Sequence, residues 1–334
     1  MKNDLIDELM SVLTGDKETD LTIIKSYIQR YKNENKEYDP EVLNTFNLLL
    51  EQYVDKDFLK NINEYQKSMN EKISQTINDA KDKLESDEYE SAKEILDELV
   101  EIIYPKLCPI NTDDIVYLDF IGPKEEALYY AYFLKDKEIR KTSLKITELF
   151  YLSAYVNLIS GNEKNFLKMI ELSLTYCPTF FNSISLLVEY HFNKKNFKKM
   201  FEYLKMGFRF VTIEEQIIKL FQYLELYLVE TGKYKEAYNV LNVISAYTED
   251  QDLIEFVDKE REYLNQFIDN FDFENDFTLN NLFGFAGFND NIFSKTASIL
   301  KISIDSNVFN EQEKNELISE YKKLNTFNAK FLKY

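Results

Sequence analysis

Apolar residues recur every three or four positions along most of the chain, and short polar breaks separate the apolar runs. The stretch IIKLFQYLELYLVE, residues 217–230, shows this spacing clearly. In an α-helix the spacing places apolar side chains on one face, where they pack against a neighbouring helix. Only 7 Gly and 5 Pro interrupt the 334 residues, so tight turns and helix breakers are few. The pattern predicts an all-α fold.

One short motif recurs at a regular interval. In GKYKEAYNVL, residues 232–241, Gly232 lies at a turn between two predicted helices, and the same frame is found upstream with Lys195 and then Gly161 at the turn, at intervals of 37 and 34 residues. A fourth copy lies within residues 73–106. The second helix of each copy carries matching residues. They are Tyr234, Ala237 and Leu241 after Gly232; Phe197, Met200 and Leu204 after Lys195; Phe166, Ile170 and Ser173 after Gly161; and Tyr89, Ala92, Leu96 and Leu99 in the copy within 73–106.

This frame resembles the tetratricopeptide repeat, in which about 34 residues form two helices with small and aromatic residues at fixed positions. The resemblance covers residues 73–106 and about 147–250. The chain departs from the family pattern because it has no Trp, and Phe166 and Met200 replace the usual small residue. The resemblance implies an α-solenoid of helical hairpins whose first helices line a concave groove. A generic helical bundle is the alternative.

The segment between the two repeat blocks has a different character. Gly122 is followed by Pro123, which suits the first position of a helix, so a helix is expected from about 123 to 134. Taken with the later repeats, the segment is similar to a group of uncharacterised bacterial tetratricopeptide-like proteins. That resemblance implies an architecture and no activity, and it is carried by Asp119, Phe120, Pro123, Glu126, Leu128 and Tyr129.

Four regions are expected along the chain. Residues 1–68 form an N-terminal helical segment, 69–146 a degenerate hairpin with a connecting helix, 147–265 three repeat units, and 266–334 a Phe-rich helical cap. The rings in the last region either plug the open end of the solenoid or form a surface for a partner or for self-association. They are Phe271, Phe273, Phe277, Phe283, Phe285, Phe288 and Phe293.

The charge balance argues against nucleic-acid binding. The 59 acidic residues outnumber the 40 basic ones, which gives a formal net charge of -19. Such a surface repels phosphates unless one face is locally basic. Only four of the bases are arginines, namely Arg30, Arg140, Arg209 and Arg261, so bidentate phosphate or guanine contacts are scarce. We expect no direct nucleic-acid partner.

The termini and the thiols indicate a cytoplasmic location. The N-terminal residues MKNDLIDELM lack the basic and apolar regions of a secretory signal, and no apolar run is long enough to span a membrane. The two cysteines, Cys108 and Cys177, have no short-spaced partner. This pattern suits a reducing compartment and argues against a structural disulfide or a thiolate zinc site.

Candidate catalytic chemistry is sparse. His191 is the single histidine, and Cys177 is the one nucleophile to consider with it. In the repeat frame, however, His191 replaces an inward aromatic residue, which favours a structural role. The acidic stretches DNFDFENDF and YTEDQD lack the spacing of a calcium loop, and no glycine-rich phosphate loop is present. We therefore expect no enzyme activity, no cofactor and no metal.

The best candidate site is the predicted groove. Residues on the first helices that are not used in packing would line it, and their Tyr, Asn and Gln side chains suit an extended peptide or a partner helix. Chaperone-type carboxylate clamps of this repeat class use several basic residues, whereas one of the lining residues is basic here. The predicted lining residues are Tyr151, Tyr155, Asn182, Ser185, Glu189, Asn193, Lys219, Gln222, Tyr223 and Glu230.

Two functional hypotheses follow from the sequence. The first is a non-enzymatic scaffold that binds a protein or peptide through the groove. The second is an acidic inhibitor or nucleic-acid mimic that occupies a basic groove of another protein, and binding of that kind weakens steeply with salt.

Overall fold

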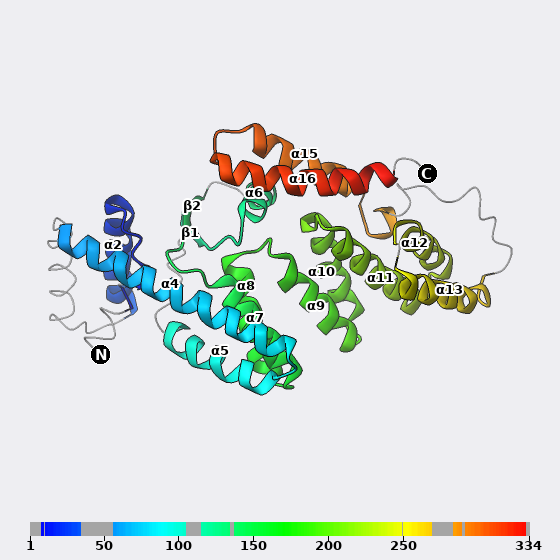
Figure 1. Ribbon diagram of the computed structural model, residues 1–334, viewed down its shortest axis with the longest axis horizontal. Helices are drawn as coiled ribbons and strands as arrows, with labels where there is room; N and C mark the ends of the chain where they lie inside the picture. Colours follow the sequence, from blue (N-terminus) through cyan, green and yellow to red (C-terminus); the bar gives the residue numbers. More distant parts are fainter. Residues whose placement is uncertain are drawn as a thin grey trace. The chain divides into compact units, whose positions relative to one another are not determined.

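The computed structural model describes residues 8–9, 11–34, 56–104, 115–133, 137–248, 250–268, 283–288 and 291–331. These residues are mostly helical, which confirms the predicted class, although they also form one small sheet (Figure 1). The helices are α2 (Lys17–Glu34), α4 (Lys56–Glu85), α5 (Tyr89–Ile103), α6 (Pro123–Tyr132), α7 (Thr147–Ile159), α8 (Glu163–Tyr176), α9 (Phe181–Asn193), α10 (Phe197–Phe210), α11 (Glu214–Glu230), α12 (Tyr234–Tyr247), α13 (Gln251–Asn265), α15 (Ile292–Asp305) and α16 (Glu311–Phe331).

The chain divides into two compact units. Unit 1 contains Met1–Ile121 and Leu134–Pro178, and unit 2 contains Gly122–Phe133 and Thr179–Tyr334. The hairpins α4–α5 and α7–α8 belong to unit 1, and the hairpins α9–α10 and α11–α12 belong to unit 2. The predicted boundary at residue 68 lies within α4, and the predicted region 69–146 contributes to both units.

All four hairpins turn through a residue in the left-handed conformation. These residues are Asp87, Gly161, Lys195 and Gly232, with φ of 59°, 71°, 53° and 74°. The predicted turn positions in the last three hairpins are therefore confirmed. A left-handed residue just after a helix lets the next amides reach back to the last carbonyls, which otherwise lack partners.

The hydrogen bonds of these turns repeat closely. In each hairpin the amide after the left-handed residue donates to a carbonyl five residues earlier at 2.8 Å, as from Asn196 to His191 and from Lys233 to Leu228. The left-handed residue itself donates three residues back, over 2.8 to 3.2 Å. This pair of bonds is the Schellman arrangement, and it closes each first helix before the second begins.

The second helices of the hairpins bury the residues that the repeat frame predicted to face inward. Ala92, Phe166, Met200 and Ala237 are all fully buried. The large side chains of Phe166 and Met200 thus occupy, without exposure to water, the position that the repeat pattern usually gives to a small residue. Gly207 marks a close approach of α10 to α11, because a Cβ there would lie 3.0 Å from the Leu220 side chain, closer than most Cβ contacts.

Part of the Phe-rich region packs inside unit 2. Phe293 on α15 is fully buried, and its ring centroid lies 5.2 Å from that of Phe283, 5.6 Å from that of Phe327 on α16 and 6.2 Å from that of Phe221 on α11. Phe283 and Phe293 therefore belong to the core, as the plug interpretation predicts. Phe285 and Phe288 are half-buried and pack against the same core. The three remaining predicted rings, at 271, 273 and 277, lie outside the described residues.

The two strands were not predicted. β1 (Ile115–Leu118) pairs in parallel with β2 (Glu138–Lys141), with Leu118 opposite Lys141. Four-residue strands are too short to give a clear alternating pattern, which is why the sequence indicated only helices here. The predicted helix between them is confirmed as α6, which begins at Pro123 and packs in unit 2 against α15 and α16.

A buried carboxyl group on α11 makes the stability of the protein depend on pH. Glu225 is 1% exposed, and neither carboxyl oxygen has a hydrogen-bond partner among the described residues. Burial, with a smaller effect of Glu260, raises the pKa of Glu225 to about 8. Between its ordinary pKa and about 8 the unfolded chain ionises while the folded chain keeps the proton, so folding loses stability as pH rises.

We expect Glu225→Gln to remove this pH dependence, because the amide does not ionise. At pH 8 the variant should be more stable than the wild type by about 2–4 kcal/mol, and the gain should shrink towards pH 5. Urea unfolding of the wild type and the variant at several pH values measures the gain in stability at pH 8 and its decrease towards pH 5. Glu230→Gln, an exposed change on the same helix, is the control and should change stability by less than about 0.5 kcal/mol. A wild-type stability that does not fall between pH 5 and 8 would contradict the prediction.

The left-handed turn of the third hairpin gives a second prediction. Lys195 adopts a conformation that only glycine takes without strain. Lys195→Gly should therefore stabilise the protein by about 0.5–1 kcal/mol in chemical unfolding. Glu202→Gly at an exposed position inside α10 should instead destabilise it by about 1 kcal/mol. Equal effects of the two substitutions would show that the turn carries no strain.

Candidate functional site

A pocket of about 340 Å³ lies in unit 1 between α4 and the N-terminal end of α7. We call it the α4–α7 pocket. Its apolar wall includes the buried Ile73, Ile77 and Phe120, whereas its remaining side chains are mostly polar or charged. The full lining is Ile73, Ser74, Ile77, Asn78, Lys81, Asp119, Phe120, Ile121, Lys145 and Glu148.

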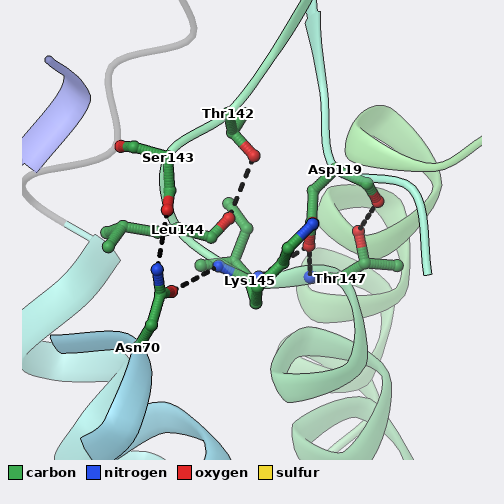
Figure 2. Close-up of polar contacts among 8 residues, drawn as sticks. Asn70, Asp119, Thr142, Ser143, Leu144, Lys145 and Thr147 are labelled. Atoms are coloured by element: carbon green, nitrogen blue, oxygen red, sulfur yellow. Dashed lines mark hydrogen bonds and ion pairs between the residues drawn. The ribbon is translucent and has the colours of Figure 1, made fainter. Parts of the chain in front are cut away.

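Asp119 connects this pocket to the start of α7. One of its carboxylate oxygens, Oδ2, accepts hydrogen bonds from the amides of Ile146 at 2.7 Å and Thr147 at 2.8 Å (Figure 2). The Thr147 hydroxyl donates to the Asp119 carbonyl at 2.7 Å, and the Asp119 amide donates to the Tyr176 carbonyl at 2.9 Å. Asp119 thus satisfies amides at the beginning of α7, where a negative charge also interacts favourably with the helix dipole.

The small sheet sets the position of Asp119. Both parallel strands end at the same edge, so residues 119 and 142 leave the sheet side by side, and the Thr142 amide donates to the Leu118 carbonyl at 2.8 Å. The short loop from Thr142 then leads into α7. The unpredicted strands therefore hold the carboxylate against the helix it stabilises.

Asn70 on α4 fixes the loop from the other side. Its side-chain amide donates to the Ser143 carbonyl at 2.8 Å, and its side-chain oxygen accepts from the Lys145 amide at 2.9 Å (Figure 2). The Asn70 side chain thus bonds both a carbonyl and an amide of the loop main chain, which are the groups that a neighbouring β-strand would otherwise pair with. This pair of bonds joins α4 to the loop that carries Lys145.

Two ion pairs line the α4–α7 pocket. Lys145 lies 3.3 Å from Asp119, and Lys81 lies 2.7 Å from Glu148. The Asp119 side chain is 1% exposed, whereas the Lys145 side chain is 60% exposed. The lysines and Glu148 can therefore turn towards a ligand, while Asp119 stays in place. Such a pocket offers charged and hydrogen-bonding contacts beside an apolar wall, a combination typical of recognition sites.

Some of the predicted groove residues meet in unit 2. Glu189 on α9 accepts a hydrogen bond from the Tyr223 hydroxyl on α11 at 3.3 Å and pairs with Lys219 at 3.7 Å. Burial, together with the nearby Glu189 carboxylate, raises the pKa of the Tyr223 hydroxyl well above its ordinary value. The first helices of two consecutive hairpins thus share a polar cluster, made of Glu189, Lys219 and Tyr223.

The other predicted residues lie at different depths. Ser185 is buried, so it does not reach an open surface. Asn182 and Gln222 are half-buried, and Asn193 and Glu230 are exposed at the ends of α9 and α11. Tyr151 and Tyr155 are half-buried on α7, in unit 1.

His191 packs between aromatic side chains, as predicted. It is 6% exposed, its ring stacks on Tyr203 with centroids 5.5 Å apart, and Tyr190 approaches edge-on at 5.0 Å. Burial lowers the pKa of His191, and the charge of Lys199 adds to the effect. Cys177 is buried as a reduced thiol in unit 1, and Cys108 lies outside the described residues.

Metal-binding groups and membrane-spanning helices are both absent from the described residues. Within them, no group of three or more His, Cys, Asp or Glu side chains is placed to hold a metal ion. None of their helices combines the length and the apolar character needed to cross a membrane.

The sequence did not indicate most of the α4–α7 pocket. Asn70, Lys81, Lys145 and Glu148 look like ordinary surface residues of helices and loops in the sequence. Asp119 was singled out, but for its place in a family-like segment rather than for a site. One signal could have pointed to Asp119, although not to the rest of the pocket: Asp119 is an acidic residue directly after the apolar run IVYL, and Thr147 lies later at a helix start.

No protein-family model matches the chain, and comparisons with curated proteins and with solved structures give no significant match. The tetratricopeptide resemblance therefore rests on the residues that carry it and stays a prediction.

We expect Asn70→Ala to destabilise the protein by about 1–3 kcal/mol, because two hydrogen bonds to the loop before α7 are lost. Chemical unfolding measures the change. Asn78→Ala is the matched control, since Asn78 lies on the same helix and lines the pocket but is exposed. The control should stay within about 0.5 kcal/mol of the wild type. Similar losses in the two variants would mean that Asn70 does not hold the loop.

Proposed function

We propose that the protein is a cytoplasmic, non-enzymatic scaffold of the tetratricopeptide-like, α-solenoid type that binds a protein or peptide along the first helices of its hairpins. One observation carries the proposal: α4 contacts α7 in unit 1 and α9 contacts α11 in unit 2, so first helices of consecutive hairpins are neighbours in both units. Stacked helical repeats bring equivalent helices together in this way and use the exposed face between them for binding.

Both neighbouring pairs carry polar recognition groups. The α4–α7 pocket offers Lys81, Lys145 and Glu148 beside an apolar wall, and the α9–α11 face offers half-buried tyrosine and amide side chains. Such groups hydrogen-bond a peptide main chain and cover its apolar side chains. A free C-terminal carboxylate is a poor ligand for the α9–α11 face, because Glu189 already neutralises Lys219.

The triple variant Tyr151→Ala, Asn182→Ala, Tyr223→Ala tests the proposal. Tagged wild-type and variant proteins are used to capture partners from the cells that make the protein, and the partners are identified by mass spectrometry. We expect a stoichiometric partner of the wild type to be lost from the variant, while circular dichroism shows that the variant is folded. The control triple Glu171→Ala, Lys198→Ala, Lys235→Ala changes exposed residues of the second helices and should retain the partner.

The salt dependence of capture separates the two functional hypotheses. A partner held by hydrogen bonds and apolar contacts should survive about 1 M salt, where the screening length falls to about 3 Å. A basic partner that binds only at low salt, and that both triple variants retain, would favour the acidic inhibitor instead. Retention of a salt-resistant partner by the Tyr151, Asn182, Tyr223 variant would overturn the assignment of the binding face.

A further inference from the structure

A second cavity of unit 1 is lined by buried polar groups that have no hydrogen-bond partner within the described part of the chain. It has a volume of about 310 Å³ and lies among α5, α7 and α8. We call it the α5–α7–α8 cavity. Its lining residues come from these helices and from the residue that follows α5. They are Asp97, Val100 and Glu101 on α5, Tyr104 directly after it, Ser153 and Asn157 on α7, and Asn165, Lys168 and Met169 on α8.

One residue that lines this cavity, Asn157, carries a buried hydrogen-bond acceptor. Asn157 is 1% exposed, and its side-chain amide nitrogen donates to the Ser153 carbonyl at 2.8 Å. That bond fixes which end of the side chain is the nitrogen, so the oxygen Oδ1 must face away from the Ser153 carbonyl. Neither this oxygen nor the buried Ser153 hydroxyl has a hydrogen-bond partner among the residues that the structure describes. Buried polar groups without partners are costly, and a ligand that donates to them removes the cost.

One carboxylate on the rim of the cavity can meet a positive charge. Asp97 is already paired with Lys93 at 2.8 Å, whereas Glu101 has no ion pair among the described residues, and Tyr104 adds an aromatic face. The ammonium of Lys168 lies 3.6 Å from the centre of the Tyr104 ring, so a cation of the chain itself already occupies this face. Attraction of this type reflects the negative charge on the face of an aromatic ring. The net charge of -19 on the whole chain adds a general attraction for cations.

We propose that the α5–α7–α8 cavity binds a protonated amine, either an ammonium or a guanidinium group, whose N–H donors reach Asn157 Oδ1 while the Glu101 carboxylate balances its charge. Such a group has only donors, and the buried groups of Asn157 and Ser153 are an acceptor and a hydroxyl that can also accept. The same chemistry occurs in free amines and in Lys or Arg side chains of a partner. This site does not depend on the proposed peptide-binding face.

Calorimetric titration of the full chain tests the assignment with defined probes. Methylguanidinium and spermidine represent free amines, and Nα-acetyl-lysine methylamide represents a side chain of a protein. N-methylacetamide is a neutral donor, and acetate is an anion. We expect saturable binding of the cationic probes and none of acetate. Tighter binding of the lysine derivative than of both free amines identifies a partner's side chain as the ligand, and the reverse order identifies a free amine.

Two neighbouring acids on α5 provide the matched variants. Glu101 lines the cavity, whereas Glu98 on the same helix is exposed and does not line it. Glu101→Gln should weaken binding of methylguanidinium by about 3–10-fold, and Glu98→Gln by less than about twofold. Neither change touches a buried residue, so both variants should fold.

Asn157→Leu removes the acceptor and should weaken binding by at least about tenfold, with circular dichroism as the check on folding. If this variant does not fold, the comparison of Glu101→Gln with Glu98→Gln still decides the question. Three results would overturn the proposal: equal effects of those two variants, equally tight binding of N-methylacetamide, or no saturable binding of any cationic probe, which would mean that the groups of Asn157 and Ser153 bind water only.

Discussion

The ends of the helices impose the constraint on which the hairpins depend. A helix leaves its last carbonyls without partners, and a chain that reverses direction within a few residues must satisfy them locally. Here one left-handed residue in each turn does so, with the amide that follows it donating back at 2.8 Å. Since the first helix ends at a fixed point in each hairpin, the second helix starts in the same frame. The buried positions Ala92, Phe166, Met200 and Ala237 then recur at matching places.

The hairpins could be predicted because their information is local. Gly161 and Gly232 mark turns directly, and the apolar spacing on either side marks the helices. Lys195 was recognised only from the interval between repeats, since a lysine gives no turn signal by itself. The sequence allowed Phe283 and Phe293 to pack in the core, as they do, but it equally allowed them to form an exposed surface. A run of aromatic residues without regular spacing does not show which rings face the core and which face water.

The α4–α7 pocket could not be predicted because its parts are far apart in the sequence. Asn70 meets the loop of Ser143 and Lys145 across more than 70 residues, and Asp119 meets the amide of Thr147 across 28. A helix usually takes its N-terminal cap from its own sequence, by the side chain just before its first turn. At α7 the capping carboxylate comes instead from the segment after β1. A pattern within a short stretch of sequence cannot indicate that a helix is capped by a residue from a distant segment. Equally, Ser185 is a polar residue that a helical frame places outside but that the packing buries.

The path of α6 bears on how the chain can be synthesised and divided. The chain leaves unit 1 after β1, forms α6 within unit 2, and returns to unit 1 at β2 before it leaves again after Pro178. Neither unit is therefore a continuous stretch of polypeptide, and truncation at any single residue leaves one of them incomplete. During translation α6 emerges well before α15 and α16, against which it packs. Its buried residues, among them Ala127 and Leu128, stay uncovered until α15 and α16 have been synthesised, and apolar surface exposed in this way favours aggregation.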